Sequence, residues 1–175
     1  KRLIYLDLTN NRVRRLQPLS GLTGLRQLFL SGNEIGNIVP LFRLSRLRVL
    51  FLSNNSISDL RALTPLTKLT RLVLRNNDIT DLGPLVSNQG LRADSIIDLR
   101  QNPLDQEDCE DIQALSARGV TVTHGSGLYL GHSVAGGILG AVECQFSLIE
   151  LTGRGTRGEE ENRSIGAHGT APYSM

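Results

Sequence analysis

Leucine and isoleucine recur at fixed intervals through the first hundred residues, and the pattern defines a repeating unit. The copy over residues 47–68 opens with LxxLxLxxN, which is formed by Leu47, Leu50, Leu52 and Asn55. Self-similarity at a fixed period of this length is the signature of a repeat architecture. Asparagine occupies the same position in five copies, with intervals of 22, 22, 22 and 25 residues: Asn11, Asn33, Asn55, Asn77 and Asn102.

The LxL segment of each copy predicts a short strand that pairs with the same strand of the next copy. Side chains alternate along a strand, so both leucines point inward and the residue between them points outward. After the strand the backbone turns sharply, and a repeated asparagine can satisfy the polar groups that this turn buries. Pro18, Pro40 and Pro84 follow at the seventh position after the asparagine. Their fixed φ predicts a tight turn or 3₁₀ segment on the outer side.

This pattern resembles the leucine-rich repeat, and the 22-residue length with NxIxDLxPLxxLxxL resembles the bacterial, internalin-like class. The resemblance covers about residues 1–104. It implies an α/β fold, a right-handed solenoid with a parallel concave sheet and a C-terminal helical cap. It also implies a role in protein binding, often at a bacterial surface.

The fifth copy departs from the pattern. Asp94 stands where the other copies have leucine, and the segment before it is three residues longer. We expect a bulged loop on the outer side of this coil and a locally weaker core.

A different pattern follows Asn102 and predicts the C-terminal cap over residues 103–124. Asp105 is a good N-cap for a helix, Ile112 and Leu115 supply its apolar stripe, and Gly119 follows its end. Residues 120–122 have the composition of a last strand. The predicted organisation is therefore five coils over 1–102, the cap over 103–124, and a glycine-rich, mostly irregular tail over 125–175.

The chain begins at Lys1, two residues before the first leucine of the repeat. This start predicts further repeats upstream in a longer protein. It also predicts self-association of the present chain through the uncapped first coil.

Composition and charge narrow the possible functions. The chain is 39% hydrophobic but only 4% aromatic, and it has no tryptophan. Residues 1–102 hold 15 Lys and Arg against 7 Asp and Glu, a net charge of +8. No aromatic residues are interleaved with Arg12, Arg14 and Arg15, so we expect a solvated surface and no nucleic-acid partner. Cys109 and Cys144 form no CxxC motif and have no histidine at ligand spacing, so neither a metal site, nor another cofactor, nor a disulfide framework is predicted.

The outward positions of the predicted sheet are the strongest candidates for a binding site. Phe29 and Phe51 fall between the LxL leucines of adjacent coils and so lie side by side, with Arg and Asp nearby. Aromatic and arginine side chains are typical of the residues that dominate protein interfaces. The alternative is that neighbouring phenylalanines merely cover each other on the ladder. The predicted protein-binding residues are Tyr5, Asp7, Phe29, Val49, Phe51, Arg71, Val73, Arg75, Asp98 and Arg100.

Other candidate motifs favour less specific interpretations. Leu128–Gly137, LYLGHSVAGG, resembles the nucleophile elbow of α/β-hydrolases with Ser133 at the nucleophile position, but Ala135 replaces its last glycine. Only 42 residues follow Ser133, so we favour an accidental match over the start of a truncated enzyme. The uninterrupted apolar run nearby is about nine residues long, too short for the ~20 of a membrane span. A third possibility is a purely structural spacer.

Overall fold

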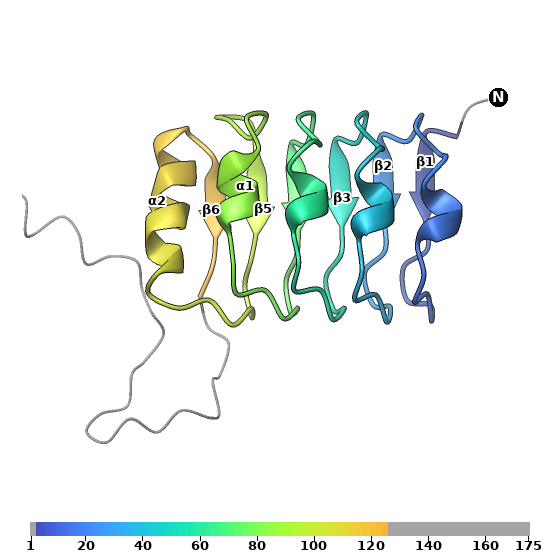
Figure 1. Cartoon of the computed structure of the whole chain (residues 1–175), viewed down its shortest axis with the longest axis horizontal. Coiled ribbons are helices and arrows are strands. Elements are labelled where there is room, and N and C mark those ends of the chain that lie inside the picture. The colour runs from blue at the N-terminus through green and yellow to red at the C-terminus, as the bar shows by residue number, and fades with distance from the viewer. Residues whose placement is uncertain (1–2, 126–175) are drawn as a thin grey trace, which may run out of the picture. The chain divides into compact units, whose positions relative to one another are not determined.

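The structure, a computed structural model, describes residues 3–125, which form one stack of coils (Figure 1). Each coil contributes one three-residue strand to a single parallel sheet, and the strands follow one another in the order β1-β2-β3-β4-β5-β6. The outer side carries short helical segments (Figure 1). The predicted leucine-rich repeat solenoid is therefore confirmed. The strands are β1 (Tyr5–Asp7), β2 (Gln27–Phe29), β3 (Val49–Phe51), β4 (Arg71–Val73), β5 (Ile96–Asp98) and β6 (Thr121–Thr123).

The register of the sheet follows the repeat period. Leu28 pairs with Leu50, Leu50 with Leu72, and Leu72 with Ile97. All four side chains are buried, because the middle residue of each strand points inward. The residues on either side of it, such as Val49 and Phe51, therefore point outward together.

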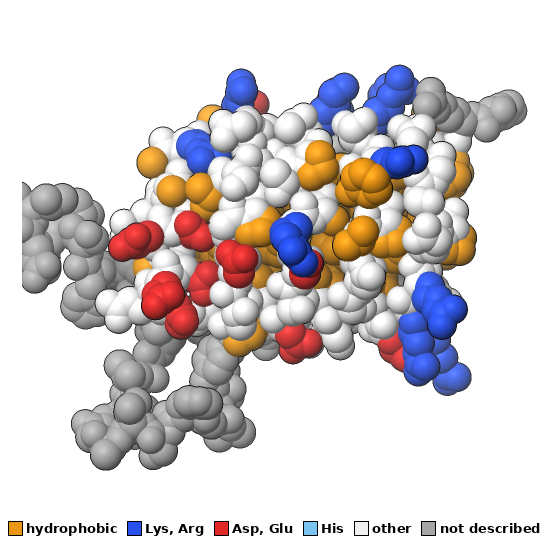
Figure 2. All heavy atoms as spheres, viewed as in Figure 1, with side chains coloured by type: hydrophobic (Ala, Val, Ile, Leu, Met, Phe, Trp, Pro, Cys, Tyr) orange, Lys and Arg blue, Asp and Glu red, His pale blue; other side chains and the backbone are white. Residues whose placement is uncertain are grey.

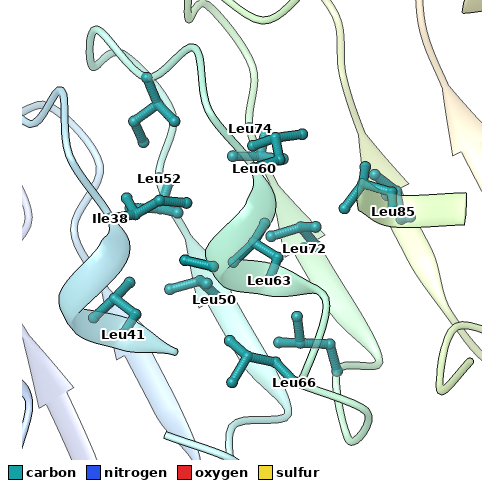
Figure 3. Close-up of a cluster of buried hydrophobic side chains, with 14 of the residues drawn as sticks. Ile38, Leu41, Leu50, Leu52, Leu60, Leu63, Leu66, Leu72, Leu74 and Leu85 are labelled. Carbon is teal, nitrogen blue, oxygen red and sulfur yellow. The ribbon is translucent and has the colours of Figure 1, made fainter. Parts of the chain in front are cut away.

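The outer side is built from 3₁₀ helices in the first three coils and a short α-helix in the fourth. These are η1 (Gln17–Leu19), η2 (Val39–Leu41), η3 (Arg61–Leu63) and α1 (Gly83–Ser87). Proline is the second residue of every one except η3, as the fixed φ of proline predicts. Figure 3 shows that Leu63 of η3 lies close to Leu50 and Leu72 of the strands, so both sides of the coil share one aliphatic core.

The repeated asparagines join each coil to the one before it. The Asn77 side chain donates from Nδ2 to the carbonyl of Leu74 in its own coil (2.9 Å) and to that of Leu52 in the preceding coil (3.0 Å). Its Oδ1 accepts a hydrogen bond from the amide of Ile57 (3.1 Å). Asn33, Asn55 and Asn102 repeat the arrangement. Both the amide nitrogen and the oxygen of the repeated asparagine side chain are thus hydrogen-bonded inside the aliphatic core.

The residue before each ladder asparagine adopts a left-handed backbone, which the sequence analysis did not foresee. Its φ angle is positive in all five coils, which is costly for side chains other than Gly, Asn and Asp. Asn76 also donates from Nδ2 to Oδ1 of Asn54 in the preceding coil (2.9 Å). The five residues are Asn10 (φ 56°), Gly32 (69°), Asn54 (54°), Asn76 (54°) and Gln101 (60°).

The fifth coil corrects the expectation about Asp94. Leu91, not Asp94, takes the buried leucine position, and Asp94 is exposed. The three additional residues form a turn directly before β5, so the insertion lies at the start of the strand and not on the outer side. The core is continuous through this coil, since Leu91, Ile97 and Leu99 are all at most 1% exposed.

A second buried asparagine secures this irregular coil. Asn88 has no exposed surface and occupies the position that Leu66 holds one coil earlier. Its Nδ2 donates to the carbonyls of Leu63 (2.8 Å) and Leu66 (3.3 Å), and its Oδ1 accepts from the amide of Gly90 (2.9 Å). These bonds bring Gly90 so close to the preceding coil that a Cβ there would stand 2.0 Å from the carbonyl oxygen of Thr67.

The cap consists of α2 (Asp108–Ala117) and β6, which pairs with β5. The predicted apolar stripe is confirmed, because Ile112 and Leu115 are buried. The predicted N-cap is wrong: Glu107 precedes the helix, and no side chain caps its first turn. Asp105 instead accepts a hydrogen bond from the amide of Glu107 (2.8 Å) and donates its own amide to Asp108 (3.0 Å). These local bonds hold the chain in a turn, and the helix starts two residues later than predicted.

The first coil presents apolar surface. β1 is an edge strand of the sheet, and Leu3 and Ile4 are 45% and 50% exposed. Self-association through this coil stays a prediction.

Replacing a ladder asparagine should weaken the stack far more in the middle than at its first coil. Asn77→Ala leaves the buried amide of Ile57 without a partner, and the carbonyl of Leu52 keeps only its hydrogen bond from Asn55. We expect the free energy of unfolding to fall by about 2 kcal/mol in urea titrations. The matched control is Asn11→Ala, because Asn11 is exposed and bonds only the carbonyls of Leu8 and Thr9. This substitution should lower the free energy of unfolding by less than about 1 kcal/mol. Equal losses at the two positions would contradict the inter-coil role.

A methyl group at Gly90 should be poorly tolerated. Gly90→Ala forces the loop away from the backbone of Thr67, and overpacking of this kind costs about 1–3 kcal/mol. Gly21→Ala is the control, because a Cβ at Gly21 meets nothing within 4 Å. Thermal unfolding of both variants, followed by circular dichroism, provides the comparison, and an unchanged melting temperature for Gly90→Ala would refute the close contact.

Candidate binding surface on the sheet

The outward positions form straight rows, because every strand pairs with the next in the same register. One row runs through Asp7, Phe29, Phe51, Val73 and Asp98. The parallel row on the other side of the buried leucines consists of Tyr5, Gln27, Val49, Arg71 and Ile96. The predicted sheet positions are therefore neighbours in space, as expected from the spacing.

Three rings, called the aromatic row below, stack in a line across the first three strands. The ring centroids of Tyr5 and Phe29 are 5.3 Å apart, and those of Phe29 and Phe51 are 4.9 Å apart with an angle of 66° between the planes. The Arg71 guanidinium continues the line, with its Cζ 5.6 Å from the centroid of Phe51. Both distances and tilts suit aromatic pairs, and the cation lies within reach of the ring.

The aromatic row is only partly covered. Tyr5 is 51% exposed, and Phe29 and Phe51 are half-buried, as are Val49 and Val73 beside them. The rings shield one another, but their outer surfaces face solvent. This arrangement leaves an apolar strip of several adjacent side chains on an otherwise polar face.

Acidic groups lie at both ends of the row. At β1 the Tyr5 hydroxyl donates to Asp7 (3.3 Å), and hydrogen bonds from Thr9 hold the pKa of Asp7 below its usual range. At β5 the Arg100 guanidinium donates to both carboxylate oxygens of Asp98 (2.9 and 2.6 Å). These bonds from Arg100 lower the pKa of Asp98, so both carboxylates are charged at neutral pH.

Two of the predicted residues stand apart from the aromatic row. Arg75 turns toward Gln101, to which its Nε donates (2.6 Å), and Arg100 is engaged by Asp98. The prediction also omitted Ile96, which is 46% exposed in the same row as Arg71. Its position in the repeat, equivalent to that of Arg71, is the sequence signal that marks it as a surface residue of the sheet.

Acidic side chains also gather where α2 begins. Asp81, Asp105, Asp108 and Asp111 line a pocket of about 290 Å³. Burial raises the pKa of Asp108 and, together with the charge of Asp81, that of Asp111. Within residues 3–125, no group of His, Cys, Asp or Glu side chains is placed to hold a metal ion.

The carboxylates of Asp59 and Asp81 serve turns. Each accepts a hydrogen bond from the amide two residues later, at Arg61 (2.9 Å) and Gly83 (2.8 Å). Ser133, His168 and Cys144 lie outside the described residues. In the part of the chain that the structure describes, no helix has the length and apolar character needed to cross a membrane.

Comparison with known proteins agrees with this architecture. The family model of leucine-rich repeats in two copies matches residues 1–43 and 45–87. Internalin C2 of Listeria monocytogenes is 34% identical, with a TM-score of 0.61 over 70% of this chain and 51% of its own. The internalin InlF of the same organism is 28% identical, with a TM-score of 0.55 over 69% and 43% of the two chains. A leucine-rich repeat protein of Leptospira interrogans is 30% identical, with a TM-score of 0.60 over 68% and 30%.

No curated protein sequence matches the chain. The chain spans about half the length of the internalin C2 chain.

Periodic leucines, an asparagine ladder and a single parallel sheet define a leucine-rich repeat protein, and this chain belongs to that family. Its 22-residue repeats and its structural neighbours make it an internalin-like member. Proteins of the family commonly serve as protein-binding modules and are typically not enzymes.

The pKa of Asp98 should depend on Arg100. A carboxyl whose folded pKa is depressed contributes stability above its unfolded pKa of about 3.9, and this contribution is lost as the pH falls through the lower folded value. In an NMR titration, the pKa of Asp98 should lie below about 3.9 in the wild type and should be higher in Arg100→Gln. Arg75→Gln is the control. It should raise the pKa of Asp98 less than Arg100→Gln does, because Arg75 acts on Asp98 only through its charge. An unchanged pKa in Arg100→Gln would refute the assigned cause.

Proposed function

We propose that the chain is a non-catalytic protein-binding module and that a partner docks on the aromatic row and its neighbours. The observation that carries the proposal is the line of Tyr5, Phe29, Phe51 and Arg71 across four strands, half-exposed and in mutual contact. Tyrosine and arginine are enriched among the residues that dominate binding energy at protein interfaces. Val49, Val73 and the charged groups Asp7, Arg75, Asp98 and Arg100 surround this centre.

The composition of the face supports binding over a purely structural role. The fold is held by the buried leucines and the asparagine ladder, and none of the aromatic side chains belongs to that core. An apolar strip with a polar surround is the usual anatomy of an interface, whose centre excludes charge and whose rim is hydrated. Stacked rings also lose little conformational freedom on binding, because their contacts already restrict them.

The alternatives have less support. An enzyme that begins near Leu128 would depend on residues outside the described part, and a spacer has no need of exposed aromatic side chains. Neither alternative accounts for the aromatic row.

Removing two rings should abolish binding without unfolding the protein. We expect Phe29→Ala/Phe51→Ala to lose the partners that the wild type captures from a cell extract. Circular dichroism and the melting temperature should change little, because both side chains are outside the leucine core.

The matched control is Phe42→Ala. Phe42 is 45% exposed on the outer side, next to η2, and its ring contacts only the guanidinium of Arg43 among the described aromatic and cationic pairs. Partners identified by quantitative mass spectrometry should be retained by this variant and lost by the double variant. If the double variant unfolds, or if both variants retain the same partners, the proposal fails.

A further inference from the structure

Basic side chains line the edge of the sheet at which the strands begin. Arg26 and Arg48 immediately precede β2 and β3, and their backbones are joined by a hydrogen bond from the amide of Arg48 to the carbonyl of Arg26 (2.8 Å). Thr70 continues this ladder with a bond to Arg48 (2.9 Å), so the positions stand at one level on successive coils. All the basic residues of this edge are exposed. We call them the strand-start rim: Arg26, Arg46, Arg48, Lys68 and Arg92.

These five charges have no acidic partner within residues 3–125. The ion pairs of the described part join Arg14 to Glu34, Arg61 to Asp59, and Arg100 to Asp98, none of which belongs to the rim. Like charges on neighbouring coils repel one another, and Asp94, the carboxylate in the turn before β5, forms no ion pair with them. The rim is therefore a strip of net positive charge beside the aromatic row.

The part of the opposite edge next to α2 has the opposite sign (Figure 2). The loops that leave the strands carry acidic residues, and Figure 2 shows Asp and Glu along the lower edge toward α2, with Lys and Arg along the upper edge, where the strands begin. A basic group beside β1 interrupts this lower edge (Figure 2). The acidic residues are Glu34, Asp59, Asp78, Asp81, Asp105 and Glu107.

The insertion in the fifth coil adds a pocket to the strand-start rim. Lys68 and Arg92 line it together with Thr67, Gln89 and Gly90, and its volume is about 410 Å³. It exists because Asn88 and Gly90 draw the loop against the preceding coil, after which the extra turn carries Arg92 outward. Two cationic side chains at a shallow pocket suit a carboxylate.

We propose that the strand-start rim binds an acidic segment, rich in Asp and Glu, of the same polypeptide partner that docks on the aromatic row. This inference rests on the function proposed above and specifies the partner's chemistry. The opposite signs of the two edges fix how the partner lies across the sheet, because its acidic segment is attracted to one edge and repelled from the other.

A polypeptide suits this surface better than a nucleic acid. Binding of single strands combines a basic groove with aromatic platforms along it, but the rings here lie on the sheet and stack on one another. Asp7 and Asp98 stand at the two ends of the row and would repel a phosphate backbone laid across it.

Selection from a displayed library of random peptides tests the partner's chemistry without a known partner. The wild-type chain should enrich peptides that combine apolar or aromatic residues with Asp and Glu. Their affinity should fall as salt is raised, because exposed charges are screened. Synthetic peptides from the selection then serve as probes for the variants.

The decisive variant reverses two charges of the rim. Arg26→Glu/Arg48→Glu should weaken binding of the selected peptides by about tenfold or more, since like charges face each other across the interface. Arg12→Glu/Arg15→Glu is the matched control, because it changes the net charge equally. Both residues are exposed, belong to none of the three ion pairs named above, and follow β1 at the opposite edge. It should change binding less than about threefold. Circular dichroism verifies that both variants fold.

The outcomes separate the two proposals. Peptides that lack an acidic bias, lose affinity in Phe29→Ala/Phe51→Ala and tolerate the rim reversal would overturn the rim and leave the aromatic row. Acidic peptides that bind Phe29→Ala/Phe51→Ala as tightly as the wild type would refute the claim that one partner contacts both surfaces. No enrichment at all would overturn both. Tighter, rim-dependent binding of a single-stranded oligonucleotide than of any selected peptide would overturn the polypeptide assignment.

Discussion

The hydrogen bonds of the ladder asparagines are the interaction on which the rest of the structure depends. A coil with a strand of only three residues makes few sheet contacts of its own, and its sharp turn buries carbonyl and amide groups. Each asparagine in the second to fifth coils bonds groups of two coils at once, as Asn77 does for Leu52 in the preceding coil and Leu74 in its own. The leucines then pack at a fixed spacing, because the ladder holds successive coils in one register. A side chain with two donors and an acceptor is what this position requires, and leucine cannot replace it.

The fixed register has a direct effect on the surface. Residues at one repeat position are brought next to each other on adjacent strands, so Phe29 and Phe51, which are 22 residues apart, come within van der Waals contact. Nothing in the core constrains these outward positions. The chain can therefore vary its surface chemistry coil by coil without changing its fold, and the aromatic row and the strand-start rim are two outcomes of that freedom.

Periodicity made much of this structure predictable. The strand positions, the asparagine contacts, the 3₁₀ segments and the order of the outward residues all follow from the repeat, because every copy adopts the same local geometry.

The errors fall where the repeat is broken. The position of Asp94 was wrong because the prediction placed the extra residues on the outer side of the coil, in the segment before Asp94. Asn88 and Leu91 keep the regular spacing, and the extra residues follow them. Asp105 failed as an N-cap because its carboxylate serves a local turn. The contacts of Arg75 and Arg100 depend on side-chain orientation, which spacing does not determine.

The left-handed residue in every coil has a consequence for how the chain folds. Asn10, Asn54 and Asn76 each enter a conformation that an isolated peptide seldom populates, and the Asn76 side chain then reaches Asn54 in the preceding coil. Closing one turn is thus unfavourable alone and becomes favourable beside a turn that is already closed. Such coupling favours assembly by propagation from a formed pair of coils, as is general for stacks whose units contact only their neighbours. The polar turn residues thereby give cooperativity to a molecule whose coils contact only their neighbours.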